Sequence, residues 1–222
     1  YEPAITQTNA KLSLPGRVVV AEAALLHPPY FVRVDILIRD QEAKTIDIIE
    51  VKSKSIDDDT ITAKFKNSSA QYAAKWLPYL YDLTFQAEVA RLNFPGYKIR
   101  PKLLLLDATK ACDKDGLHQL FQIIQTQNSE TGVSRVQIKT PPNLTEKDIG
   151  SLNFLREVDV SDIVDELRHM PIDNVAHVPE IYRQDLGTFM KWTGELQMQG
   201  HRVFHGVSKT CRACQYRAPA GT

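Results

Sequence analysis

The sequence has no apolar run approaching the roughly 20 residues that a membrane-spanning helix needs. It also has no internal repeat, no low-complexity tract and no excess of one charge, since Lys plus Arg and Asp plus Glu both number 27. A protein dedicated to coating DNA is usually more basic. Neutrality lowers the expectation of tight non-specific nucleic-acid binding, but it does not exclude an enzyme whose acidic metal site offsets a basic surface.

Cysteine is scarce, with only Cys112, Cys211 and Cys214 in the whole chain. An odd and sparse set argues against a disulfide scaffold and indicates a reducing compartment. We therefore expect a cytoplasmic protein without membrane association. The lack of a visible signal peptide carries little weight, because the chain starts at Tyr1 rather than at Met.

The length of 222 residues suits one large core, or a core with a helical appendage. The apolar fraction of 43% and the charged fraction of 24% are ordinary for a globular protein. The character of the sequence shifts near residue 140. We expect a core over residues 1–140 and a mainly helical extension over residues 141–222 that packs on the core and ends in a CxxC motif.

Three strands are predicted in the first quarter of the chain. Residues 31–39 alternate between apolar and polar positions, which is the period of a strand. Residues 17–28 are rich in Val, Ala and Leu, and Pro28-Pro29 indicate a turn into the next strand. A polar turn then leads to a third strand over 45–53, so the three strands form an antiparallel meander.

The middle of the chain predicts a crossover connection. Residues 69–93 carry one apolar stripe at helical spacing, with Pro78 either kinking the helix or marking its start. Residues 98–107 follow as a strongly apolar, buried strand. A helix between two strands is typical of α/β folds, so we expect a mixed central sheet flanked by helices.

The remaining segments give weaker patterns. Residues 1–16 and 54–68 are predicted to be irregular. The expected elements of the second half are a short helix over 116–127, a strand over 133–139, a helix begun by the capping box at Thr145, a short helix from Ser161 to Pro171 and a helix over 186–200.

Three residues of the meander suggest chemistry. Glu50 and Lys52 lie two apart on one strand, so their side chains share a face. If the hairpin turns near residue 42, Asp35 falls opposite residues 49–50. Two carboxylates with the backbone carbonyl of Val51 offer oxygen ligands for Mg²⁺ or Mn²⁺. Such a cation lowers the pKa of bound water, while an ammonium group stabilises the transition state of phosphodiester hydrolysis.

The simplest alternative is a charged hairpin face in water, because a D…ExK pattern is common by chance. The sequence context makes this D…ExK pattern more significant, since Asp35 and Glu50 lie within apolar strands where an unpaired charge is costly. Gln86 and Asp82 lie one turn apart on the following helix, and Gln86 would contact substrate or the site. Lys54 extends the KSK run toward a phosphate contact, or is simply solvated.

The segments VRVDILIRD, IDIIEVKSKS and DLTFQAEV together resemble the RecB-type branch of the PD-(D/E)xK nuclease superfamily. They are also similar to an uncharacterised bacterial domain family with EVKS and DxxFQ motifs. The resemblance covers residues 17–110. It implies a restriction-endonuclease-like core and a catalytic set of Asp35, Glu50, Lys52 and Gln86 that cleaves DNA, with RNA not excluded.

The sequence departs from the family pattern in two places. The family Gln is usually followed four residues later by Tyr, where this chain has Ala90. The upstream His of many RecB-type enzymes has no firm counterpart, because Glu22 and His27 fall on a predicted strand rather than on a helix. Neither residue is assigned to the site.

The C-terminal pair Cys211 and Cys214 has the spacing of metal ligands. Some RecB-type nucleases hold an iron–sulfur cluster with a similar closing motif, which implies a cluster or a Zn²⁺ here. Such sites need about four ligands. Only Cys112, His201 and His205 could join the pair, so two ordinary thiols are an equally good interpretation.

Three hypotheses follow from the sequence. The first is a metal-dependent deoxyribonuclease. The second is a catalytically inactive nucleic-acid-binding or assembly module on the same fold, which the neutral charge and the incomplete Gln motif favour. The third is a small-molecule enzyme or interaction domain with an accidental D…ExK pattern, which predicts that the two carboxylates lie far apart.

Overall fold

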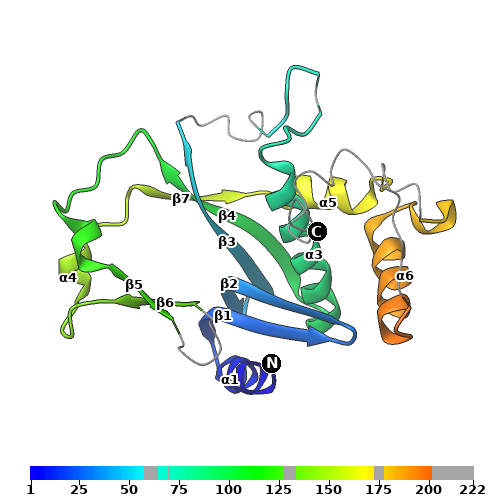
Figure 1. Cartoon of the computed structure of the whole chain (residues 1–222), viewed down its shortest axis with the longest axis horizontal. Coiled ribbons are helices and arrows are strands. Elements are labelled where there is room, and N and C mark those ends of the chain that lie inside the picture. Colours follow the sequence, from blue (N-terminus) through cyan, green and yellow to red (C-terminus); the bar gives the residue numbers. More distant parts are fainter. Residues whose placement is uncertain (58–64, 70, 128–133, 173–177, 202–222) are drawn as a thin grey trace, which may run out of the picture. The chain divides into compact units, whose positions relative to one another are not determined.

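A computed structural model describes residues 1–57, 65–69, 71–127, 134–172 and 178–201 of the chain (Figure 1). The fold is α/β, with a mixed five-stranded sheet in the order β1-β2-β3-β4-β7 and a separate two-stranded sheet of β5 and β6. This agrees with the predicted class. Among the described residues, none of the helices is both long and apolar enough to cross a membrane.

The predicted meander is confirmed. Strand β1 (Arg17–His27) pairs antiparallel with β2 (Tyr30–Asp40), and β2 pairs antiparallel with β3 (Thr45–Ile56). The two prolines between β1 and β2 form the tight turn expected from the sequence, and the bond between them is cis. Strand β3 extends three residues beyond the prediction.

The predicted crossover is also confirmed. Helix α3 (Leu77–Asn93) separates β3 from β4 (Lys98–Asp107) in the sequence. The amide of Lys98 donates to the carbonyl of Lys44, and the amide of Ala108 donates to the carbonyl of Ile56. Both strands therefore run in the same direction. Pro78 lies in the first turn of α3, where its missing N–H costs nothing, so it marks the helix start.

The chain divides into two compact units. The first consists of residues 1–49, 74–101 and 160–222, and the second of residues 50–73 and 102–159. The predicted boundary at residue 140 was based on a shift in sequence character rather than on contacts. It stays a prediction. So does the packing of a helical extension on the core.

In the first unit, α1 (Glu2–Leu12) and α3 lie on opposite sides of the β1–β2 hairpin (Figure 1). The prediction of an irregular segment over residues 1–16 is wrong. Pro3 suits the first turn of a helix, and the hydroxyl of Thr8 accepts a hydrogen bond of 2.9 Å from the amide of Ala24 on β1. This contact with a distant strand holds a polar helix that has little apolar pattern of its own.

Two more helices complete the first unit. Helix α5 (Ser161–His169) packs against α3, and α6 (Leu186–Met198) contacts α5 and the single turn η2 (Glu180–Tyr182). Both helices were predicted. Asp185 caps α6, because its carboxylate accepts a 2.7 Å hydrogen bond from the amide of Thr188.

The second unit contains the end of β4 paired antiparallel with β7 (Leu155–Asp159). It also contains the turn η1 (Leu117–Leu120), the hairpin of β5 (Gln122–Gln127) and β6 (Ser134–Lys139), and α4 (Glu146–Ile149). Strand β6 and the capping box of α4 were predicted. The helix expected over 116–127 is wrong, since Ile123 and Ile124 pair with β6, and β7 was not anticipated.

Candidate functional site

Glu50 and Lys52 lie in the second unit at the point where β3 passes from a buried to an exposed stretch. Every residue from Thr45 to Glu50 is buried, whereas Val51 is exposed. The amino group of Lys52 forms a salt bridge with the carboxylate of Glu50. Their shared face, predicted from strand alternation, is thus confirmed. Glu50 is only 5% exposed, so an ionised carboxylate here depends on charge compensation.

Asp35 lies in the first unit on β2, half-buried. Within that unit, the last pair of the β2–β3 ladder is Ile36 with Ile49. The predicted position of Asp35 opposite residues 49–50 lies beyond the last pair of this ladder and stays a prediction.

In the first unit, the strand that carries Asp35 also pairs with β1. The β1–β2 ladder pairs Ala21 with Ile36 and Ala23 with Val34, which leaves Glu22 level with Asp35. Glu22 has a φ of 53°, a left-handed conformation that is rare in a strand and costs about 1 kcal/mol or more. Its carboxylate forms a salt bridge of 2.6 Å with Arg33, and both side chains are exposed.

Gln86 comes from α3, also in the first unit, and is 4% exposed. Its side-chain amide donates a 3.4 Å hydrogen bond to the carboxylate of Asp82 one turn earlier. Helix α3 covers the even-numbered face of β2, as shown by the rings of Tyr30 and Phe85, whose centroids lie 6.2 Å apart. The odd-numbered face, which includes Asp35, is the one on the side of α1.

The same alternation is visible at Arg39, which lies four residues beyond Asp35 on the odd-numbered face. Its guanidinium donates hydrogen bonds to the carbonyls of Leu14 and Gly16, just after α1. Within the first unit, Asp35 and the helix that carries Gln86 therefore belong to opposite faces of β2. A site that joins Gln86 to Asp35 stays a prediction and has less support than the strand residues.

The other predicted site residues contribute less. The side chain of Val51 is exposed and only its carbonyl was proposed as a ligand, while Lys54 is exposed near the end of β3. Cys211 and Cys214 lie outside the described residues. Among the residues that the structure describes, no group of three or more His, Cys, Asp or Glu side chains is arranged to hold a metal ion.

The sequence analysis missed an ion pair in the first unit that joins a buried carboxylate to a partly exposed guanidinium. Asp47 on β3 is almost fully buried, and its carboxylate contacts the guanidinium of Arg100 on β4 at 2.5 Å. Asp47 is an odd position of β3, so it faces away from Glu50. The pair joins two neighbouring strands. The signal in the sequence is the charged residue Asp47 within the otherwise apolar segment TIDIIE.

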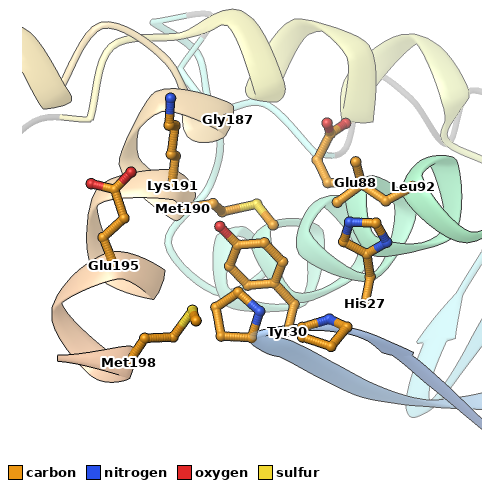
Figure 2. Close-up of a pocket in the computed structure, with 11 residues that line it drawn as sticks. His27, Tyr30, Glu88, Leu92, Gly187, Met190, Lys191, Glu195 and Met198 are labelled. Atoms are coloured by element: carbon orange, nitrogen blue, oxygen red, sulfur yellow. The ribbon is translucent and has the colours of Figure 1, made fainter. Parts of the chain in front are cut away.

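A second feature missed from the sequence is a pocket in the first unit. It lies between the β1–β2 turn, α3 and α6 (Figure 2). Neither Asp35 nor Gln86 lines it. Pro28 and Pro29 were interpreted only as a turn, because the partners that close the pocket come from segments some 60 and 160 residues further along the chain.

No protein family model, curated protein or solved structure matches this chain. The functional argument therefore depends on the chemistry of the residues themselves.

Proposed function

We propose that the chain is a Mg²⁺- or Mn²⁺-dependent nuclease that hydrolyses phosphodiester bonds in DNA on a restriction-endonuclease-like core. The observation that carries the proposal is the pairing of Lys52 with the buried carboxylate of Glu50 on β3. An acid and an ammonium group held together in an apolar strand are costly to bury, and such an arrangement is a candidate for function rather than for stability.

The donor atoms suit a hard divalent cation. The carboxylates of Asp35 and Glu50 and the carbonyl of Val51 are oxygen ligands, which Mg²⁺ and Mn²⁺ prefer. When bound, the cation supplies positive charge at the phosphate and a water of lowered pKa. Lys52 would orient the attacking water and stabilise the charge that develops on the phosphate oxygens. Lys54 would contact a neighbouring phosphate, and Gln86 would contact the substrate.

One observation favours a second candidate, a nucleic-acid-binding module without catalytic activity. The ammonium group of Lys52 already compensates the charge of Glu50, so this carboxylate does not require a cation to remain buried. In such a module the pair would be retained for its structure. DNA would then bind equally well with and without a divalent cation, and it would not be cleaved.

Cleavage of labelled single-stranded and duplex DNA, and of RNA, in Mg²⁺ and in Mn²⁺ tests the proposal. We expect Glu50→Gln, Lys52→Met and Asp35→Asn each to lower the cleavage rate by about 100-fold or more, because each removes a group that acts on the transition state. Glu157→Gln is the matched control, since it removes the partially exposed partner of Lys102, also on a strand of the second unit.

The control variant should cleave like the wild type, and thermal melting should show that all variants are folded. Equal cleavage by the wild type and the three site variants would overturn the nuclease proposal at these residues. Metal-independent DNA binding without cleavage by any variant would establish the second candidate instead.

A further inference from the structure

The pocket between the β1–β2 turn, α3 and α6 has a volume of about 330 Å³ (Figure 2). Sites for small molecules usually measure about 300–1,000 Å³, with mainly apolar walls and a few placed polar groups. Apolar walls are present here, from Pro28, Pro29, Leu92, Met190 and Met198. All of these residues belong to the first unit, so the pocket is formed within one compact body.

A glycine of α6 brings the helix close to the turn. A Cβ atom at Gly194 would lie 2.7 Å from Cγ of Pro29 and 3.0 Å from the hydroxyl oxygen of Tyr30. Only a residue without a side chain allows this approach. The phenol ring of Tyr30 is thus held against α6, and the ring of Phe85 on α3 lies edge-on to it, with the centroids 6.2 Å apart. The position of Tyr30 in the pocket is therefore fixed from two sides.

Figure 2 shows the ring of Tyr30 in the middle of the pocket, with Glu195 and Met198 on one side and His27 and Leu92 on the other. The face of an aromatic ring carries partial negative charge. Burial and the negative charge of Glu195 raise the pKa of the Tyr30 hydroxyl. Glu195 lines the same pocket as Tyr30, so its carboxylate and the ring of Tyr30 border the same space.

The other ionisable groups of the lining are His27, Glu88 and Lys191. Glu88 is compensated by Arg91 and by Arg168, whose Nε lies 2.9 Å from the Glu88 carboxylate. The amino group of Lys191 points away from Tyr30 (Figure 2). Among the described residues, Glu195 forms no salt bridge. The wall on the α6 side therefore carries a carboxylate that forms no salt bridge in the described part of the chain, and Lys191 lies one turn before it on the same helix.

We propose that this pocket binds a small organic cation, an ammonium group attached to an apolar body. The ammonium group lies over the ring of Tyr30 and close to Glu195, where the ring and the carboxylate attract it together. The apolar body contacts Met190, Met198 and Pro29. An organic anion of the same size is repelled by Glu195, and a neutral analogue gains only the apolar contacts.

Titration calorimetry with three matched probes tests this proposal. The probes are 2-phenylethylammonium, the neutral 2-phenylethanol and the anion phenylacetate, which share an aromatic body and differ in charge. We expect the ammonium compound to bind about tenfold more tightly than the alcohol, as a partly desolvated cation over an aromatic ring would. Phenylacetate should bind more weakly than either.

Two variants locate the effect. Glu195→Gln should abolish the preference for the ammonium probe over the alcohol, and Tyr30→Leu should weaken binding of the ammonium probe several-fold. Glu180→Gln, which removes an exposed carboxylate of the same unit outside the pocket, should bind all three probes like the wild type. Far-ultraviolet circular dichroism verifies that each variant is folded.

Three outcomes would overturn the proposal. These are equal affinity for the cationic and neutral probes, a preference that persists in Glu195→Gln, and the absence of binding of any probe at millimolar concentration. Because neither Asp35, Glu50 nor Lys52 lines the pocket, this result is independent of the nuclease assay.

Discussion

The β1–β2 hairpin of the first unit and the β5–β6 hairpin of the second bury their apolar side chains to different extents. In the first unit, helices lie on both sides of the β1–β2 hairpin, and Val34, Leu37 and Leu83 are fully buried. In the second unit, the β5–β6 hairpin exposes Ile123 and Ile138, which face each other across the strands. A two-stranded sheet gains stability mainly from a layer that covers it. The first hairpin has such layers, whereas Ile138 on the second remains 65% exposed.

The largest expected effect contrasts a buried side chain next to the first hairpin with an exposed side chain on the second. Leu83→Ala on α3 should lower the free energy of unfolding by about 3 kcal/mol, since it leaves a cavity in a closed core. Ile138→Ala on β6 should change it by less than about 0.5 kcal/mol, because the side chain is already largely in water. Urea unfolding followed by tryptophan fluorescence measures the first unit, which contains both Trp76 and Trp192.

Circular dichroism follows both units in the same samples. If Ile138→Ala destabilises the protein as strongly as Leu83→Ala, the hairpin of the second unit is covered in solution. The contrast between the two hairpins would then be wrong.

The next effect concerns how closely α6 approaches the hairpin of the first unit. Gly194→Ala should destabilise the protein by about 1–3 kcal/mol, because the new methyl group overlaps the ring of Pro29. Gly187→Ala in the same helix is the matched control. Its Cβ would meet nothing closer than 3.5 Å, so the better helix propensity of Ala should stabilise the protein by up to about 1 kcal/mol. Opposite signs in thermal unfolding confirm the close approach, and equal signs contradict it.

The smallest effect concerns the cap of α6 and depends on pH. The hydrogen bond from the Thr188 amide lowers the pKa of Asp185 below its unfolded value of about 3.9. The carboxylate therefore stabilises the fold above about pH 4, and this contribution disappears as the pH falls through the folded pKa. Asp185→Ala should cost about 1 kcal/mol at pH 7.

Asp185→Asn separates the cap from the charge. An amide oxygen still accepts the hydrogen bond, so this variant should lose little stability at pH 7 and should depend less on pH below 5 than the wild type. Thermal unfolding between pH 3 and pH 7 measures the difference. A wild-type protein and an Asn variant with parallel profiles would show that Asp185 does not titrate in the cap.

The strands of the central sheet could be predicted from the sequence because their signal is local. Residues 31–39 alternate, and residues 98–107 combine a long apolar run with a preceding helix. The failures have a common physical origin. Helix α1 depends on the contact between Thr8 and β1, and β7 is a five-residue strand whose partner β4 lies some 50 residues earlier. No local pattern contains those contacts.

The candidate site was predictable in part for the same reason. Glu50 and Lys52 are two residues apart, so strand alternation alone gives their shared face. The register of β2 with β3 follows from a short turn, which the sequence also contains. The position of Gln86 depends on which face of the sheet α3 covers, and the pocket around Tyr30 depends on three separate segments. Neither arrangement is encoded in a local pattern.

The discontinuity of the first unit has a consequence for synthesis of the chain. A ribosome completes the β1–β2 hairpin early, but α5, which packs on α3, is translated only after the whole of the second unit. The surface of α3 that α5 covers therefore stays exposed while residues 102–159 are translated. The order of translation thus leaves the unit with the covered hairpin to be finished last.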